Sequence, residues 1–169
     1  MALPTTNLSI PNNVQVQGSL TCNSFNAPSG CVNNAAVLGG ANVDASKLNR
    51  RLQPVYRQPS ASPAAVDQQA LHIAHNPGTV VNVDVGAIVA NLSPATVVFD
   101  LLKNGASILG SPITLDNTTP AYALKAGTIA AAPCNAGDVF EAKVVSATAG
   151  GGTLAKGIFL RLTIEEQGT

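Results

Sequence analysis

Short runs in which apolar and polar residues alternate recur between residues 66 and 166. In the clearest of them, residues 160–165, every second residue is leucine or isoleucine, and the residues between are arginine, threonine and glutamate. Side chains of a β-strand point alternately to opposite faces, so this pattern predicts strands that bury one face. The predicted strands cover residues 71–73, 81–85, 97–102, 108–115, 122–124, 139–145 and 160–165.

Turn signals separate these runs. Asn104-Gly105 stands between two apolar runs, and this dipeptide is the strongest short signal for a β-hairpin. Pro112 predicts that part of the following run, residues 108–115, is an edge strand or a bulge. The glycines 150–152 predict a flexible turn. About seven or eight short strands with no long helical pattern predict an all-β fold. Over residues 66–169 we expect an antiparallel β-sandwich of jelly-roll or immunoglobulin-like type.

Residues 1–58 follow a different pattern. Their apolar residues come in short pairs, such as Leu8 with Ile10 and Val14 with Val16, separated by prolines and by Asn-Asn and Gly-Gly pairs. Each pair is too short to form a stable strand alone. This stretch therefore predicts an extended N-terminal arm that becomes ordered against another surface. The Pro-Ser-Ala-Ser-Pro stretch that follows indicates a linker over residues 59–65.

One short helix is predicted within the arm, over residues 44–53. Asp44 stands at its start and two arginines near its end, which is the arrangement that the helix dipole favours. Leu48 and Leu52 are four residues apart and would share one face, and Pro54 ends the pattern.

Charge is scarce and unevenly placed. The 169-residue chain has a net charge of zero, and only 11% of its residues are charged, against about 25% in ordinary domains. Residues 1–59 carry a net charge of +3 and the remainder −3. The bases of the arm are Lys47, Arg50, Arg51 and Arg57. A basic patch beside apolar residues suggests docking on an acidic protein surface, with a solvated helix face as the alternative. Nucleic acid is disfavoured because the patch is small and aromatic residues are few.

Candidate chemistry is sparse. His72 and His75 are three apart in a predicted strand, so they point to opposite faces and cannot form a ligand pair. The acids are scattered singly, and Glu165-Glu166 is expected to be solvated. The three cysteines, Cys22, Cys31 and Cys134, have no disulfide or zinc spacing. We therefore expect no enzyme activity, no cofactor and no metal, and neither a signal peptide nor a membrane span.

The residues of the arm nevertheless resemble a known kind of protein. Residues 18–37, followed by Val43-Asp-Ala-Ser-Lys-Leu48, resemble the N-terminal segments of bacteriophage head-decoration and head-fibre proteins. Residues 97–109 resemble the β-sandwich modules of tailed-phage virion proteins. The resemblance implies a virion protein, made in the host cytoplasm, that binds the major capsid protein on the outer surface of a phage head. It also implies a homotrimer that stabilises the shell and has no catalytic residues.

This hypothesis assigns the contacts to the arm and its basic patch. Arginines would steer the protein to an acidic shell, and leucines would pack beneath them. The alternative is a receptor- or carbohydrate-binding module of a phage fibre, which the few aromatic residues disfavour because Phe99, Phe140 and Phe159 are expected to face the core. The residues expected to contact the capsid or sister subunits are Leu8, Ile10, Val14, Val16, Leu48, Arg50, Arg51, Leu52 and Arg57.

Overall fold

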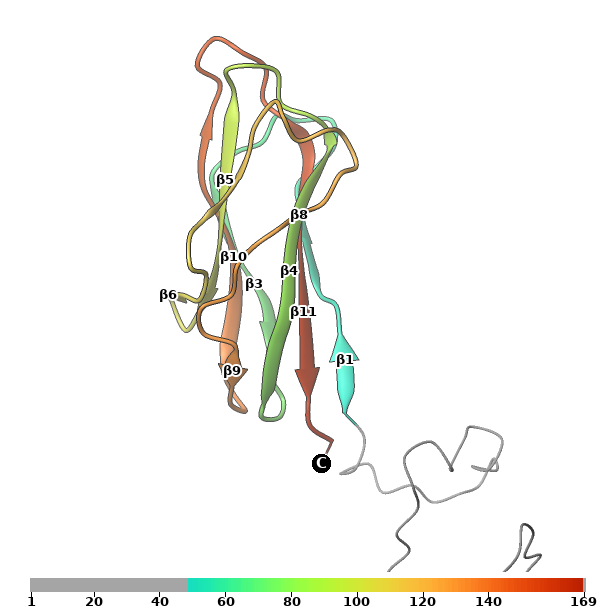
Figure 1. Ribbon diagram of the computed structural model, residues 1–169, viewed down its shortest axis with the longest axis vertical. Helices are drawn as coiled ribbons and strands as arrows, with labels where there is room; N and C mark the ends of the chain where they lie inside the picture. The colour runs from blue at the N-terminus through green and yellow to red at the C-terminus, as the bar shows by residue number, and fades with distance from the viewer. Residues whose placement is uncertain (1–48, 169) are drawn as a thin grey trace, which may run out of the picture. The chain divides into compact units, whose positions relative to one another are not determined.

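Two antiparallel sheets face each other in the computed structural model, which describes residues 49–168 (Figure 1). This part of the chain contains strands and turns and no helix, so the predicted all-β sandwich architecture is confirmed for it. Sheet A contains β1 (Arg50–Leu52), β2 (Val55–Arg57), β4 (Gly78–Val89), β8 (Lys125–Ala126), β9 (Pro133–Cys134) and β11 (Lys156–Glu166). Sheet B contains β3 (Asp67–Ile73), β5 (Thr96–Lys103), β6 (Ala106–Ser107), β7 (Ile113–Leu115) and β10 (Val139–Thr148).

The strand order places the longest strands inside the sheets. In sheet A the order is β1-β11-β4-β8, with β2 also paired to β11 and β9 to β4. In sheet B it is β3-β10-β5-β6, with β7 also paired to β5. The longest strands, β4, β10 and β11, lie inside the sheets, and the short ones lie at the edges. Edge strands bury less surface and gain fewer hydrogen bonds, so short apolar runs suffice there.

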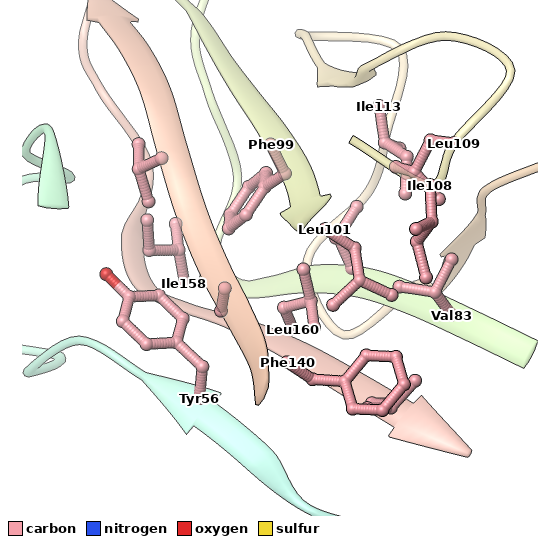
Figure 2. Close-up of a cluster of buried hydrophobic side chains, with 14 of the residues drawn as sticks. Tyr56, Val83, Phe99, Leu101, Ile108, Leu109, Ile113, Phe140, Ile158 and Leu160 are labelled. Atoms are coloured by element: carbon pink, nitrogen blue, oxygen red, sulfur yellow. The ribbon is translucent and has the colours of Figure 1, made fainter. Parts of the chain in front are cut away.

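The core fills the space between the sheets. The alternation predicted for β11 is confirmed, because Leu160, Leu162 and Ile164 have no exposed surface. Phe99 and Phe140, from β5 and β10, are equally buried (Figure 2). Side chains of both sheets therefore meet in one apolar cluster.

The predicted hairpin is confirmed. Lys103 of β5 pairs with Ala106 of β6 across Asn104 and Gly105, whose φ angles are 52° and 80°. Two positive φ angles are the signature of the tight turn that Asn-Gly favours. Of the strand predicted over residues 108–115, only β7 forms. Pro112 lies just before β7, as expected for a residue without an N–H to donate.

Two sequence predictions fail in this region. Residues 122–124 form no strand, because Tyr122 has a φ of 63° in a turn and the pairing segment is the following β8. The helix predicted over 44–53 is wrong in its second half, since residues 50–52 form β1. Its first half lies outside the described residues. Leu52 packs against the core from the sheet edge, so burial in the sheet overrides the local helical pattern.

The boundary of the sandwich also lies earlier than the sequence suggested. Both β1 and β2 pair with β11, so residues 50–57 of the predicted arm belong to sheet A. The expected linker is attached to the body as well. Pro63 bridges Lys156, and the N–H of the buried Ala64 donates to the carbonyl of Ala155.

Asp138 joins two turns at one end of the sandwich. It accepts from Asn104 Nδ2 at 2.7 Å and from the N–H of Asn135 at 2.9 Å. These bonds favour the ionised carboxylate and hold the pKa of Asp138 below its usual range, the backbone bond from Asn135 contributing most.

A lowered pKa makes this link sensitive to acid. Its contribution to stability is present above the unfolded pKa of about 3.9 and is lost as the pH falls through the lower folded value. We therefore expect Asp138→Asn to lose less stability than the wild type between about pH 6 and about pH 2.5. Urea unfolding at both pH values measures this, and an equal loss in the two proteins would contradict it.

Candidate interaction surface

The arginines expected at the interface gather on one edge of sheet A. Strands β1 and β2 run beside β11 at this edge (Figure 1). Arg50, Arg51 and Arg57 are exposed, whereas Leu52 is half-buried against the core. We call β1 and β2, residues 50–57, the arginine edge. The other expected contact residues lie outside the described residues: Leu8, Ile10, Val14, Val16 and Leu48.

Two of the three arginines have no ion-pair partner among the described residues. Arg51 Nε lies 3.5 Å from Glu165 Oε1, but both side chains are exposed, so this pair contributes little. Arg50 and Arg57 make no ion pair within 4.0 Å in the described part of the chain. An acidic partner could therefore engage them without breaking an existing bond.

Hydrogen bonds hold the arginine edge in place. Tyr56 is buried, and its hydroxyl donates to Asp67 Oδ2 at 3.0 Å. Gln58 Nε2 donates to the Tyr56 hydroxyl at 2.6 Å and to the Ala65 carbonyl at 2.7 Å, and Gln58 Oε1 accepts from the Ala65 N–H at 2.9 Å. Burial raises the pKa of Tyr56 to about 12, so the phenol stays protonated. The end of β2 is thereby tied to β3 and to the segment before it.

An apolar groove lies next to this edge. Its volume is about 210 Å³, and Phe159 of β11 lies on it with Ile88 of β4. Phe159 crosses over Gly86, where a Cβ atom would lie only 2.6 Å from Cζ of the ring. The outer face of sheet A therefore carries an aromatic ring. The groove is lined by Val55, Arg57, Gln58, Ile88, Gly157 and Phe159.

The half-buried ring of Phe159 corrects one sequence prediction. Phe99 and Phe140 face the core as expected, but Phe159 does not. Its neighbours Ile158 and Leu160 are fully buried, so alternation turns Phe159 outward. The signal was present in the sequence, since the alternation predicted for residues 160–165 extends back by one residue.

A buried acid links the two sheets. The Glu166 side chain is fully buried, which corrects the expectation that it is solvated. Its Oε1 lies 2.6 Å from His72 Nε2, on β3 of the other sheet, and 3.3 Å from the His75 N–H. The two side chains thus share one hydrogen bond, whose donor depends on which of them holds the hydrogen. Glu166 Oε2 has no partner among the described residues. The ring of His72 also stacks on Phe140, with centroids 6.4 Å apart.

The one cysteine of the described residues lies close to this pair. Cys134 is buried nearby, since both Cys134 and Glu166 pair with Gly78. Burial raises the pKa of the Cys134 thiol, and the carboxylates of Glu166 and Asp138 raise it further. Little of the thiol is therefore ionised to the nucleophilic thiolate.

Residues 49–168 contain no group of three or more potential metal ligands. In the same residues no helix is long and apolar enough to cross a membrane.

Comparison with protein-family models and with curated proteins finds no match for this chain. The surfaces described above are therefore the basis for a functional assignment.

Proposed function

We propose that this chain is a non-enzymatic structural protein that binds an acidic protein surface through the arginine edge. Following the resemblance of its sequence, we propose that this surface belongs to the major capsid protein on the outside of a phage head. The protein decorates and stabilises the shell as a homotrimer. The arm, residues 1–49, adds contacts to the capsid or to sister subunits.

One observation carries the proposal. Arg50, Arg51 and Arg57 are exposed along a single sheet edge, and two of them have no ion-pair partner in the described residues. Positive charges held this way steer association with an acidic surface and fix its orientation. Three copies in one trimer would present three such edges, so that binding of one holds the others close.

Reversing the edge charges tests the steering. We expect Arg50→Glu with Arg51→Glu and Arg57→Glu to slow association with purified phage heads by about tenfold or more at low salt. The difference shrinks as ionic strength rises, because exposed charges are screened. Surface plasmon resonance on immobilised heads of the encoding virus measures the rate.

The matched control replaces the same three arginines with lysine. This variant keeps the charge, so its association rate should stay close to that of the wild type. An unchanged rate in the glutamate variant would contradict the proposal. Light scattering of the free protein tests the trimer, and a mass equal to that of one chain would contradict that part.

A second candidate function is carbohydrate binding, in a receptor-binding module. The observation in its favour is the half-buried ring of Phe159, which lines a groove together with Arg57 and Gln58. Aromatic faces bind the apolar faces of sugar rings, and planar polar groups bind their hydroxyls.

A glycan array tests this second function. Binding to an oligosaccharide should be lost in Phe159→Ala and kept in the control Tyr122→Ala, whose side chain is 74% exposed and lies outside the groove. Binding that survives Phe159→Ala would exclude the groove as the sugar site.

A further inference from the structure

The arginine edge is also the free edge of a sheet. Strand β1 is the outermost strand of the order β1-β11-β4-β8, and β2 continues it along β11. No strand of the described residues pairs with the far side of either. A free edge presents unpaired N–H and C=O groups that can pair with another chain.

The hydrogen bonds to β11 show which groups are free. The Gln58 N–H donates to Ile158 O at 2.9 Å, and the Leu162 N–H donates to Pro54 O at 3.0 Å. Residues of an antiparallel strand direct their backbone groups alternately to either side. Pro54, Tyr56 and Gln58 therefore face β11, while Val55 and Arg57 direct N–H and C=O to the open side.

Proline does not protect this edge. Natural sheets block exposed edges with proline or with charged side chains. Pro54 O accepts a hydrogen bond from β11, so the missing N–H of Pro54 also falls on the β11 side. The donors on the open side remain intact. The arginine side chains therefore determine which strands can pair with this edge.

The side chains define the chemistry of the partner. Arg51, Val55 and Arg57 lie opposite Glu165, Arg161 and Phe159 of β11. All three belong to the outer face of sheet A, since the neighbouring Tyr56 is buried on the inner face. Val55 is 40% exposed between the two charges. A strand added to this edge would therefore place carboxylates beside the arginines and an apolar residue beside Val55.

We propose that the arginine edge binds an extended acidic segment of the partner protein as an additional β-strand of sheet A. The inference rests on the proposed function and deepens it, because it names the binding mode and the partner's chemistry. Main-chain hydrogen bonds supply affinity in this mode, and alternate side chains supply specificity. The segment alternates acidic and apolar residues on the face that meets Arg51, Val55 and Arg57.

A synthetic peptide tests the binding mode on the full chain. The probe is the nine-residue peptide Thr-Glu-Thr-Val-Thr-Gln-Thr-Glu-Thr. Its control has the same sequence with N-methyl groups on alternate amides, which keeps the charges and removes the strand hydrogen bonds. We expect the control to bind at least about tenfold more weakly in calorimetry, in line with the loss of several hydrogen bonds. We also expect the unmodified peptide to slow hydrogen exchange at the Val55 and Arg57 amides.

The outcomes separate the two proposals. Equal binding of the two peptides would overturn strand addition and leave the acidic-surface proposal standing. If neither peptide binds and the glutamate variant associates with phage heads at the wild-type rate, both proposals fail. Val55 and Arg57 amides already protected in the free protein would show the edge to be occupied by the chain itself or by a sister copy, and would also overturn the inference.

Discussion

Phe99→Ala should lower the free energy of unfolding by about 3–5 kcal/mol, the range for truncating a buried phenylalanine. The Phe99 side chain has no exposed surface and lies in the middle of β5, where Ile113 and Val144 flank it on the neighbouring strands. Truncation removes apolar contacts on several sides and leaves a cavity that the two sheets cannot close without shifting. Chemical denaturation followed by circular dichroism measures the loss.

Phe159→Ala is the matched control for this prediction. It removes the same side chain from the outer face of the same sandwich, where water already reaches the ring. Because the Phe159 ring is half-buried over Gly86, we expect a loss clearly smaller than that of Phe99→Ala. Should Phe99→Ala leave no folded protein, Phe99→Leu provides a smaller change in the same direction. Equal losses at positions 99 and 159 would contradict the assignment of Phe99 to the core.

His72→Leu should destabilise the protein by about 3 kcal/mol, the lower end of the range for removing one partner of a buried pair. Glu166 would then remain fully buried without its 2.6 Å partner. The His75 N–H, at 3.3 Å, compensates only weakly. Leucine has a similar volume, so most of the loss reports the uncompensated acid rather than a cavity.

The single variant Glu166→Met and its combination with His72→Leu complete this test. Glu166→Met removes the buried acid, and the His72 side chain, 18% exposed, can still reach water. We therefore expect Glu166→Met alone to be much less harmful than His72→Leu. The combined variant should recover most of the stability that His72→Leu loses. Losses that simply add would show that the two side chains do not interact in the folded protein.

The strands of the core could be predicted because burial of one face imposes a period of two. The pattern of β5 and β11 was evident from their apolar residues alone, and the turn at Asn104-Gly105 followed from backbone sterics. The same rule also applied to Phe159, although its apolar character suggested burial. Alternation, and not hydrophobicity, decides the direction of a side chain within a strand.

The arginine edge shows where local signals are insufficient. Residues 50–52 have charges and leucine spacing that suit a helix, yet they form a strand. The open side of β11 supplies backbone partners and a place in the core for Leu52. Those gains come from residues more than one hundred positions away along the chain, as the pairing of Arg50 with Glu166 illustrates.

The class of the fold, the main strands and the short hairpin turn can be read from the sequence, because each depends on neighbouring residues. The sequence also shows that positive charge is concentrated between residues 47 and 57. Strand pairing and packing, by contrast, place three of these charges on a free sheet edge and bury Glu166 against His72. Pairing between distant segments sets both, since the exposure of a residue depends on what the rest of the chain packs against it.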